Sequence, residues 1–85
     1  MKNILKKASI VDVRTPQEFA QGHYPGAVNI PLNEVSQRIG EFKNMQQPIV
    51  TYCRSGNRSG MATAILKQSG VSEVYNGGGL DDLLQ

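Results

Sequence analysis

Short apolar runs rich in β-branched residues recur along the chain, and glycine, proline or polar residues separate them. Runs of this kind predict β-strands. The run over 49–52 carries no charged residue, which is expected of a strand that is covered on both faces. The predicted strands cover residues 9–13, 27–30, 49–52 and 71–75.

Capping residues predict a short helix after the first strand. Thr15 suits the N-cap, Pro16 suits the first helical position, and Glu18 completes a capping box with Thr15. Gly22 is expected to end this helix. The segment 23–26, which contains proline and glycine, then predicts a turn into the second strand.

Two further helices are predicted from apolar residues at helical spacing. Asn33 is expected to cap a helix over 34–43. A longer helix over 58–69 should end at Gly70. Its apolar stripe, which is expected to face the core, consists of Met61, Ala62, Ile65 and Leu66.

Strands that alternate with helices favour an α/β fold, with a central parallel sheet and helices on both faces. Residues 77–79, three glycines, predict a loop before a last helical turn over 80–84. In open parallel sheets, ligands bind at the carboxyl ends of the strands. Arg14, Cys53 and the glycines 77–79 each follow a strand, so we expect them at the same edge of the sheet.

Length and composition narrow the class of protein. The 85 residues predict a single domain over 1–85, with residues 1–8 as a terminal extension. The net charge of +2 is too small to favour nucleic acid, and no apolar run is long enough to span a membrane. With one cysteine and one histidine, neither a disulfide nor a metal or other cofactor is expected. We expect a monomer, located in the cytoplasm, or in the periplasm if a signal peptide was removed.

The single cysteine, Cys53, directly follows the strand over 49–52 and precedes a glycine-containing loop and a helix. Backbone N–H groups of such a loop, together with the helix dipole, bind anions and lower the pKa of a neighbouring thiol. A lone cysteine is usually inert and buried, but this ordered pattern favours a nucleophile. Tyr52 should point to the opposite face and pack in the core. The residues expected to bind substrate are Arg54, Ser55, Gly56, Asn57 and Arg58, with Arg14 from the first strand.

Four segments resemble, in the same order, the motifs of rhodanese-type sulfurtransferases. Residues 53–59, Cys-x-x-Gly-x-Arg-Ser, are similar to the active-site loop. Residues 19–31 are similar to the N-terminal signature, although Tyr24 stands where isoleucine or valine is usual. Residues 12–14 match an Asp-aliphatic-Arg motif, and residues 76–80 match a late Gly-Gly segment without the tryptophan that often follows it. The subfamily that looks most similar is that of small single-domain bacterial enzymes of the phage-shock-protein-E type.

The resemblance implies a rhodanese-like fold and a ping-pong transfer of sulfur. Cys53 would attack the outer sulfur of a donor such as thiosulfate, release sulfite and carry a persulfide. A thiophilic acceptor, cyanide or a thiol, would then take that sulfur. The N–H groups of the loop would hold the persulfide sulfur, while Arg54 or Arg58 would face the oxygens of thiosulfate.

Two other functions stay open at this point. Cysteine phosphatases and arsenate reductases also place a Cys-loop-Arg segment before a helix, but with one more residue in the loop. Four residues separate Cys53 from Arg58, so the narrower loop favours a single sulfur atom over a phosphoryl group. A phosphatase also needs an acid for its leaving alcohol, and nothing connects Asp81 or Asp82 to the loop. The second alternative, a non-catalytic rhodanese-like module that binds proteins, is disfavoured by the retained cysteine.

Three residues, Asp12, Ser59 and His23, are expected to support the site rather than to react. Asp12 should accept hydrogen bonds from the loop backbone or pair with an arginine, and His23 should be a structural turn residue. Arg14 would either reach the donor anion or pair with Glu18, which lies one helical turn further on.

Overall fold

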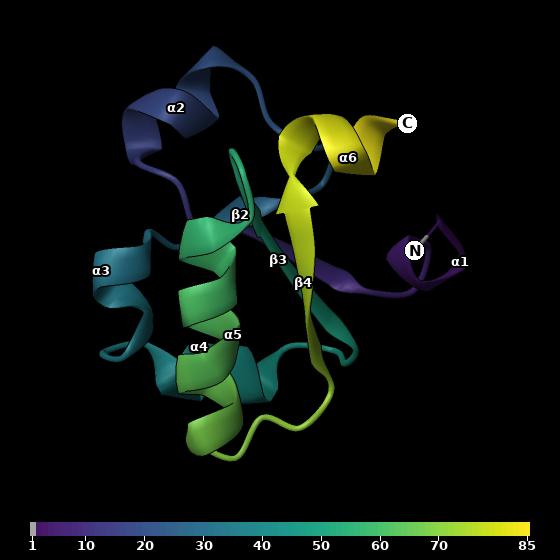
Figure 1. Ribbon diagram of the computed structural model, residues 1–85. Helices are drawn as coiled ribbons and strands as arrows, with labels where there is room; N and C mark the ends of the chain where they lie inside the picture. The colour runs from purple at the N-terminus through teal and green to yellow at the C-terminus, as the bar shows by residue number, and fades with distance from the viewer. Residues whose placement is uncertain (1) are drawn as a thin grey trace.

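The strands form one parallel sheet, with an apolar cluster of the core on each of its faces. The computed structural model describes residues 2–85, and the strand order in the sheet is β2-β1-β3-β4 (Figure 1). The two central strands, β1 and β3, pair in register from Ser9–Ile49 to Asp12–Tyr52. The strand bounds are β1 Ser9–Asp12, β2 Val28–Asn29, β3 Ile49–Cys53 and β4 Val74–Gly79.

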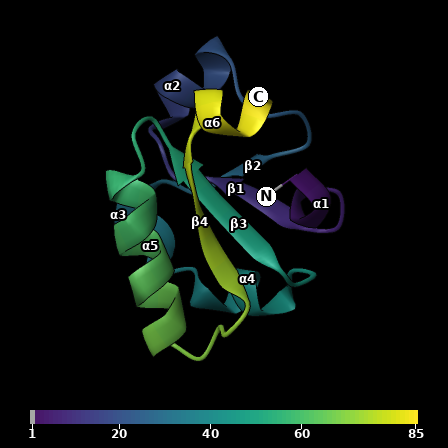
Figure 2. The ribbon, with the colours of Figure 1, turned by 45° about the vertical axis from the view of Figure 1, so that its right-hand side comes forward.

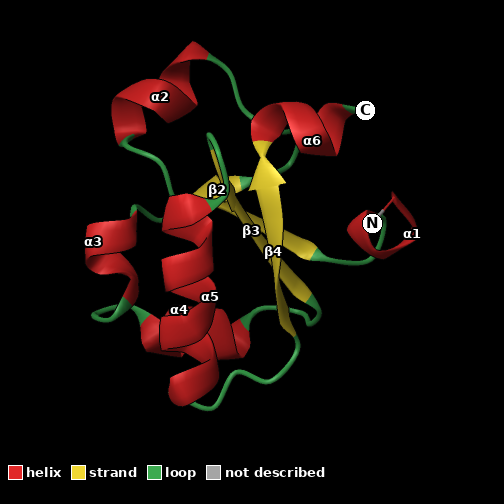
Figure 3. Ribbon diagram, in the orientation of Figure 1, coloured by secondary structure: helices red, strands yellow, loops and turns green. Residues whose placement is uncertain are grey.

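Helices cover both faces of this sheet (Figures 2 and 3). The first face packs against α3, α4 and α5, and the opposite face packs against α1 and α6. Helix α2 lies beyond the end of the sheet toward which β4 points (Figure 1). The predicted α/β fold is therefore confirmed. The helix bounds are α1 Lys2–Leu5, α2 Pro16–Gln21, α3 Leu32–Val35, α4 Ile39–Asn44, α5 Asn57–Gln68 and α6 Leu80–Leu84.

Strand β3 lies in the middle of the core, and all five of its residues are buried. Its side chains alternate between the faces, so that Ile49 and Cys53 join one apolar cluster while Val50 and Tyr52 join the other. Tyr52 and Cys53 thus lie on opposite faces, as predicted. The alternation places the thiol on the side of α5, the helix that follows it.

The helix predictions from capping residues are confirmed where a cap is present. The Thr15 hydroxyl accepts a hydrogen bond from Glu18 N–H at 3.2 Å, and Glu18 Oε1 accepts one from Thr15 N–H at 3.0 Å. Helix α5 follows the prediction to within one residue at each end. Gly70, just past its end, has a φ of 99°, a left-handed conformation that favours glycine.

The prediction of one helix over 34–43, capped by Asn33, is wrong. Two short helices form instead, and neither has a side-chain cap. The backbone leaves the helical conformation at Arg38, whose φ is −120° and ψ is 26°. The Arg38 guanidinium binds Glu34 at 3.1 Å and Glu41 at 2.6 Å, and so links the two sides of the break. Ser36 and Gly40 flank the break and are weaker helix formers than alanine, which lowers its cost.

The last strand begins and ends later than predicted. It runs over 74–79 rather than 71–75, and it includes the three glycines that were expected to form a loop. Glycine is required in this strand because neighbouring atoms pack too closely for a side chain. A Cβ on Gly77 would lie 2.8 Å from a methyl group of Val50, and a Cβ on Gly79 would lie 2.2 Å from the Arg54 carbonyl oxygen.

The expectation that Met61 faces the core is also wrong, since 53% of this residue is exposed. The buried face of α5 is partly polar, and on it the Thr63 hydroxyl lies 3.0 Å from the Thr51 hydroxyl. The buried face of α5 therefore differs from the predicted apolar stripe. The buried residues of α5 are Ser59, Ala62, Thr63 and Leu66.

At the N-terminus, part of the predicted extension over 1–8 is helical. Helix α1 contributes Leu5 to the apolar cluster that also holds Tyr52 and Leu83. Met1 lies outside the described residues. In the part of the chain that the structure describes, no helix combines the length and the apolarity needed to cross a bilayer.

Candidate active site

Cys53 is the last residue of β3 and is fully buried. Its Sγ accepts a hydrogen bond from Gly56 N–H at 3.0 Å and lies 3.4 Å from the Ser59 hydroxyl oxygen. Gly56 caps α5 with a φ of 99°, a left-handed conformation that suits glycine. The chain thereby turns tightly enough for the start of α5 to face back onto the sulfur. The loop and the helix N-terminus enclose the thiol as the sequence pattern predicts.

This surrounding polarity lowers the pKa of the thiol. Burial of Cys53 opposes ionisation, but hydrogen bonds from the Ser59 hydroxyl and from the backbone N–H groups of Ser59, Gly56 and Ser55 outweigh it. The net result is a pKa of about 7. A substantial fraction of Cys53 is therefore thiolate at neutral pH, and the thiolate is the nucleophilic form.

The two arginines of the loop differ in their partners. Arg58 forms a two-contact ion pair with Glu18 of α2, at 2.7 and 3.1 Å. The Arg58 guanidinium holds the pKa of Glu18 at about 2, and Glu18 raises the pKa of Arg58. Arg54 is exposed and makes no side-chain hydrogen bond or ion pair with the described residues 2–85. Arg54 therefore has a guanidinium that is available to an incoming anion.

Behind the loop, Arg14 is held in a buried network. Its Nε lies 2.9 Å from Asp12 Oδ1, and its Nη2 lies 2.6 Å from Asp12 Oδ2. The Tyr52 hydroxyl donates a hydrogen bond to Asp12 Oδ2 at 2.9 Å, and Arg14 Nη2 also donates to the Gly22 carbonyl at 2.7 Å. Of the two roles left open for Arg14, a pair with Glu18 does not form. The prediction that Asp12 pairs with an arginine is confirmed.

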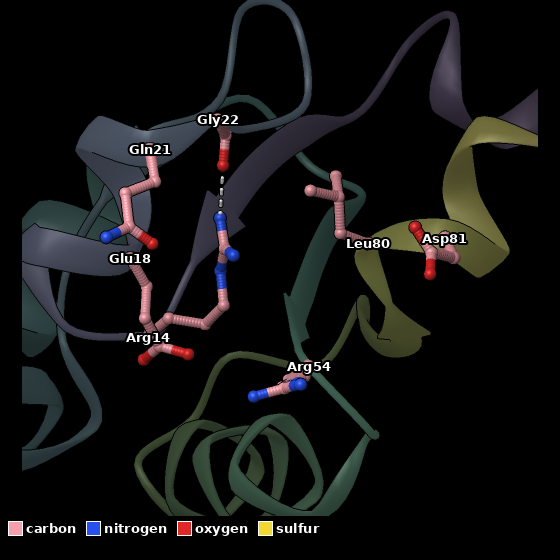
Figure 4. A pocket seen from close by; sticks show the side chains of 7 residues that line it. All are labelled: Arg14, Glu18, Gln21, Gly22, Arg54, Leu80 and Asp81. Carbon is pink, nitrogen blue, oxygen red and sulfur yellow. Dashed lines mark hydrogen bonds between the residues drawn. The ribbon is translucent and has the colours of Figure 1, made fainter.

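A pocket of about 390 Å³ lies beside the loop (Figure 4). Arg14 runs up one wall toward Gly22, and Arg54 projects from below (Figure 4). Cys53, which is fully buried, is not among the residues that line this pocket. Two arginines and two carboxylates line the pocket, so it is charged but nearly neutral overall. The lining residues are Arg14, Glu18, Gln21, Gly22, Arg54, Leu80 and Asp81.

The loop is supported from the opposite side by β4. Asn76 Nδ2 donates a hydrogen bond to the Gly56 carbonyl at 3.0 Å, and its Oδ1 accepts one from the Ser59 hydroxyl at 2.6 Å. Gly79 lies so close to the Arg54 carbonyl that no side chain fits between them. The late glycine segment thus holds the cysteine loop in place, although it is remote in sequence.

The other predicted site residues lie on the loop, against Cys53 or at the turn after α2. Ser55 and Asn57 are exposed on the loop, while Ser59 is buried against Cys53. The ring of His23 stacks on Phe19 at 3.7 Å, and its Nδ1 lies 2.9 Å from the Phe19 carbonyl oxygen, so it braces the turn after α2. Among residues 2–85, no three His, Cys, Asp or Glu side chains gather to hold a metal ion.

Sequence reasoning missed two residues of the site, Glu18 and Asn76. Glu18 was predicted to complete a capping box or to pair with Arg14, whereas its partner is Arg58, 40 residues away. Asn76 appeared only as the first residue of a glycine motif. Neither residue carries a local signal, because each acts through a contact made by the fold.

Comparison with known proteins decides among the remaining alternatives for the family. A family model described as the rhodanese-like domain matches residues 1–83. The chain belongs to the rhodanese-like domain family. It is 42% identical to the thiosulfate sulfurtransferase PspE of Escherichia coli over 74 residues, which cover 86% of this chain and 71% of PspE.

Two further matches show how much of each related protein this rhodanese-like chain covers. It is 44% identical over 71 residues to YqhL, an uncharacterized protein of Bacillus subtilis; these cover 84% of this chain but 56% of YqhL. A solved structure, a rhodanese with anions from E. coli, superposes with a TM-score of 0.81 at 41% identity, covering 88% of this chain and 89% of that one. The rhodanese-like sheet and its order of elements thus have an experimental counterpart.

Proposed function

We propose that this chain is a sulfurtransferase that carries sulfane sulfur as a persulfide on Cys53. The observation that supports it best is the thiol itself: a buried sulfur at the end of β3, bound by Gly56 N–H at 3.0 Å and with a pKa of about 7. Its likeness to PspE, a thiosulfate sulfurtransferase by name, points to thiosulfate as a donor.

In the proposed first step, the Cys53 thiolate attacks the outer sulfur of thiosulfate. The new bond joins Sγ to that sulfur, while the bond within thiosulfate breaks and sulfite leaves with its electron pair. In the second step, cyanide or a thiolate attacks the outer sulfur of the persulfide, and Cys53 leaves as the thiolate. No general acid is required, because sulfite and the Cys53 thiolate both leave as stable anions.

The residues of the loop have separate parts in this proposal. The N–H groups at the start of α5 would stabilise the negative outer sulfur of the persulfide, as preorganised donors do in other anionic intermediates. Arg54, unpaired among residues 2–85, would bind the oxygens of the donor. Because Cys53 has no exposed surface, the exposed residues of the loop must shift for a donor to reach Sγ.

Mass spectrometry of the intact chain tests the proposal. After incubation with thiosulfate, wild-type chain should gain the mass of one sulfur atom and lose it again when cyanide is added. Since Cys53 is the single cysteine, Cys53→Ser should show no gain. A chain that gains no sulfur but hydrolyses an aryl phosphate would instead be a phosphatase.

A further inference from the structure

The side chain of Asn76 touches the cysteine loop through both ends of its amide. Oδ1 accepts hydrogen bonds from the Ser59 hydroxyl at 2.6 Å and from Gly78 N–H at 2.9 Å. Nδ2 donates to the Gly56 carbonyl at 3.0 Å. That carbonyl also accepts a helical hydrogen bond from Gly60 N–H at 2.9 Å, so it keeps one partner without Asn76. The contact that bears on reactivity is therefore the one with Ser59.

The Ser59 hydroxyl has one hydrogen and two acceptors within reach. Asn76 Oδ1 lies 2.6 Å away and Cys53 Sγ lies 3.4 Å away. Ser59 is fully buried, so water does not serve as a third acceptor on its own side. A single hydrogen serves one acceptor well at a time, and the two acceptors therefore compete for it.

We propose that Asn76 is a positioning residue that competes with Cys53 for the Ser59 hydroxyl hydrogen. While Cys53 is a thiol, the hydroxyl donates to Asn76. When the thiol proton passes to solvent, the hydroxyl turns and donates to the thiolate. In a persulfide the charge moves to the outer sulfur, and the hydroxyl returns to Asn76. The hydroxyl thus keeps an acceptor in every state, and its direction follows the charge on Cys53.

This inference rests on the proposed function only in treating Cys53 as the nucleophile. A titration of the thiol needs no sulfur donor, so its failure is distinct from a failure to transfer sulfur. The charged groups around the loop are Arg54 beside Cys53, Arg58 of α5 with its partner Glu18 of α2, and Asp82 of α6, which accepts from Gly79 N–H at 2.8 Å. The variants below leave all of these unchanged.

The test is the pKa of Cys53, measured from the rate of iodoacetamide alkylation against pH in folded protein. Asn76→Leu keeps roughly the size of this exposed side chain and removes the acceptor, while Ser59 itself is fully buried. The pKa should fall by about 0.5–1 unit, because the hydroxyl then has only the sulfur to bind. Ser59→Ala should raise the pKa, and adding Asn76→Leu to Ser59→Ala should change nothing further. Asn44→Leu, an exposed site at the end of α4, is the matched control.

A rise or no change in the pKa of Asn76→Leu would overturn the proposal, because a residue that only braces the loop would raise it when removed. An equal shift with and without Ser59 would overturn it as well. If Asn76→Leu does not fold, Asn76→Asp carries the test. Its carboxylate holds the hydroxyl more strongly, so the pKa should rise further with Ser59 present than in the Ser59→Ala background. Equal rises would show that charge alone acts, against the proposal.

Discussion

Two ion pairs hold arginines near Cys53, and they differ chiefly in burial. The Asp12–Arg14 pair is closed, with side-chain exposures of 0% and 9%. The Glu18–Arg58 pair is open, with exposures of 27% and 33%. Both pairs have short N–O contacts, so distance does not separate them. Two ion pairs of the same chemical type therefore contribute differently, because one is buried and the other is partly exposed.

In the buried pair, each charge depends on its partner, because both side chains are almost fully buried. Removing one partner of such a pair leaves the other charge uncompensated and strongly destabilises the fold. In the open pair, water and other anions replace a lost partner, and the net contribution is small. We therefore assign the Asp12–Arg14 pair to architecture, and we expect the Glu18–Arg58 pair to exchange with a bound anion.

The largest expected effect is that of Asp12→Ala. It removes the three hydrogen bonds that the Arg14 guanidinium donates to Asp12 and the acceptor of the Tyr52 hydroxyl, and it leaves the Arg14 charge buried. The free energy of unfolding in urea should fall by about 3–5 kcal/mol. Asp81→Ala, an exposed carboxylate at the pocket rim, is the control and should change stability by less than about 0.5 kcal/mol. Equal losses in the two variants would remove the distinction between the pairs.

Arg54→Ala should have the next largest effect, and on activity rather than on stability. Arg54 belongs to neither ion pair, so its guanidinium is the one we expect to bind the donor. Losing a charge-assisted hydrogen bond should lower kcat/KM for thiosulfate by about 10- to 100-fold, equivalent to about 1.5–3 kcal/mol. Urea unfolding should be unchanged, because the side chain is exposed.

Arg38→Ala is the matched control for Arg54→Ala, since it removes an arginine whose ion pairs lie on α3 and α4. It should leave kcat/KM unchanged. Arg54→Lys should recover part of the loss, because lysine keeps the charge but not the planar pair of donors. Full activity in Arg54→Ala would show that the Arg54 guanidinium does not bind the donor.

The sequence predicts those parts of the site that are continuous in the chain. Cys53, the Gly56 turn and the start of α5 follow one another, so local rules for strands, turns and caps place them. The capping box of Thr15 and Glu18 is local for the same reason. The alternating strand and helix signals predict the α/β class, and the resemblance of the four motifs implies the rhodanese-like fold.

What the sequence does not predict depends on contacts between distant segments. The Glu18–Arg58 pair joins α2 to α5, and Asn76 reaches the loop from β4. The glycines 77–79 were misread because close packing and tight turns both require glycine, and only the fold distinguishes them. Met61 was misread because the buried face of α5 includes polar residues that an apolar pattern overlooks.

The smallest expected effect is that of Glu18→Gln, which opens the exposed pair while keeping the size of the side chain. The free energy of unfolding should fall by at most about 1 kcal/mol at neutral pH. Hydrogen bonds from Arg58 depress the pKa of Glu18 from 4.5 to about 2 in the folded chain. The pair therefore stabilises the fold fully above pH 4.5, and its contribution is lost as the pH falls through about 2. The stability difference between Glu18→Gln and wild type should vanish over that interval.

Glu18→Gln also distinguishes two effects of Glu18 on the site, namely the negative charge that it adds to the pocket and its ion pair with Arg58. Glu18 places a carboxylate in the pocket and holds Arg58, so its neutralisation should lower KM for thiosulfate by about 2- to 5-fold with little change in kcat. Asp81→Asn also removes a negative charge from the pocket but frees no arginine within residues 2–85. If the two variants lower KM equally, the pocket responds only to net charge. A lower KM in Glu18→Gln alone would show that Arg58 exchanges Glu18 for the donor anion, as an exposed pair permits and a buried one does not.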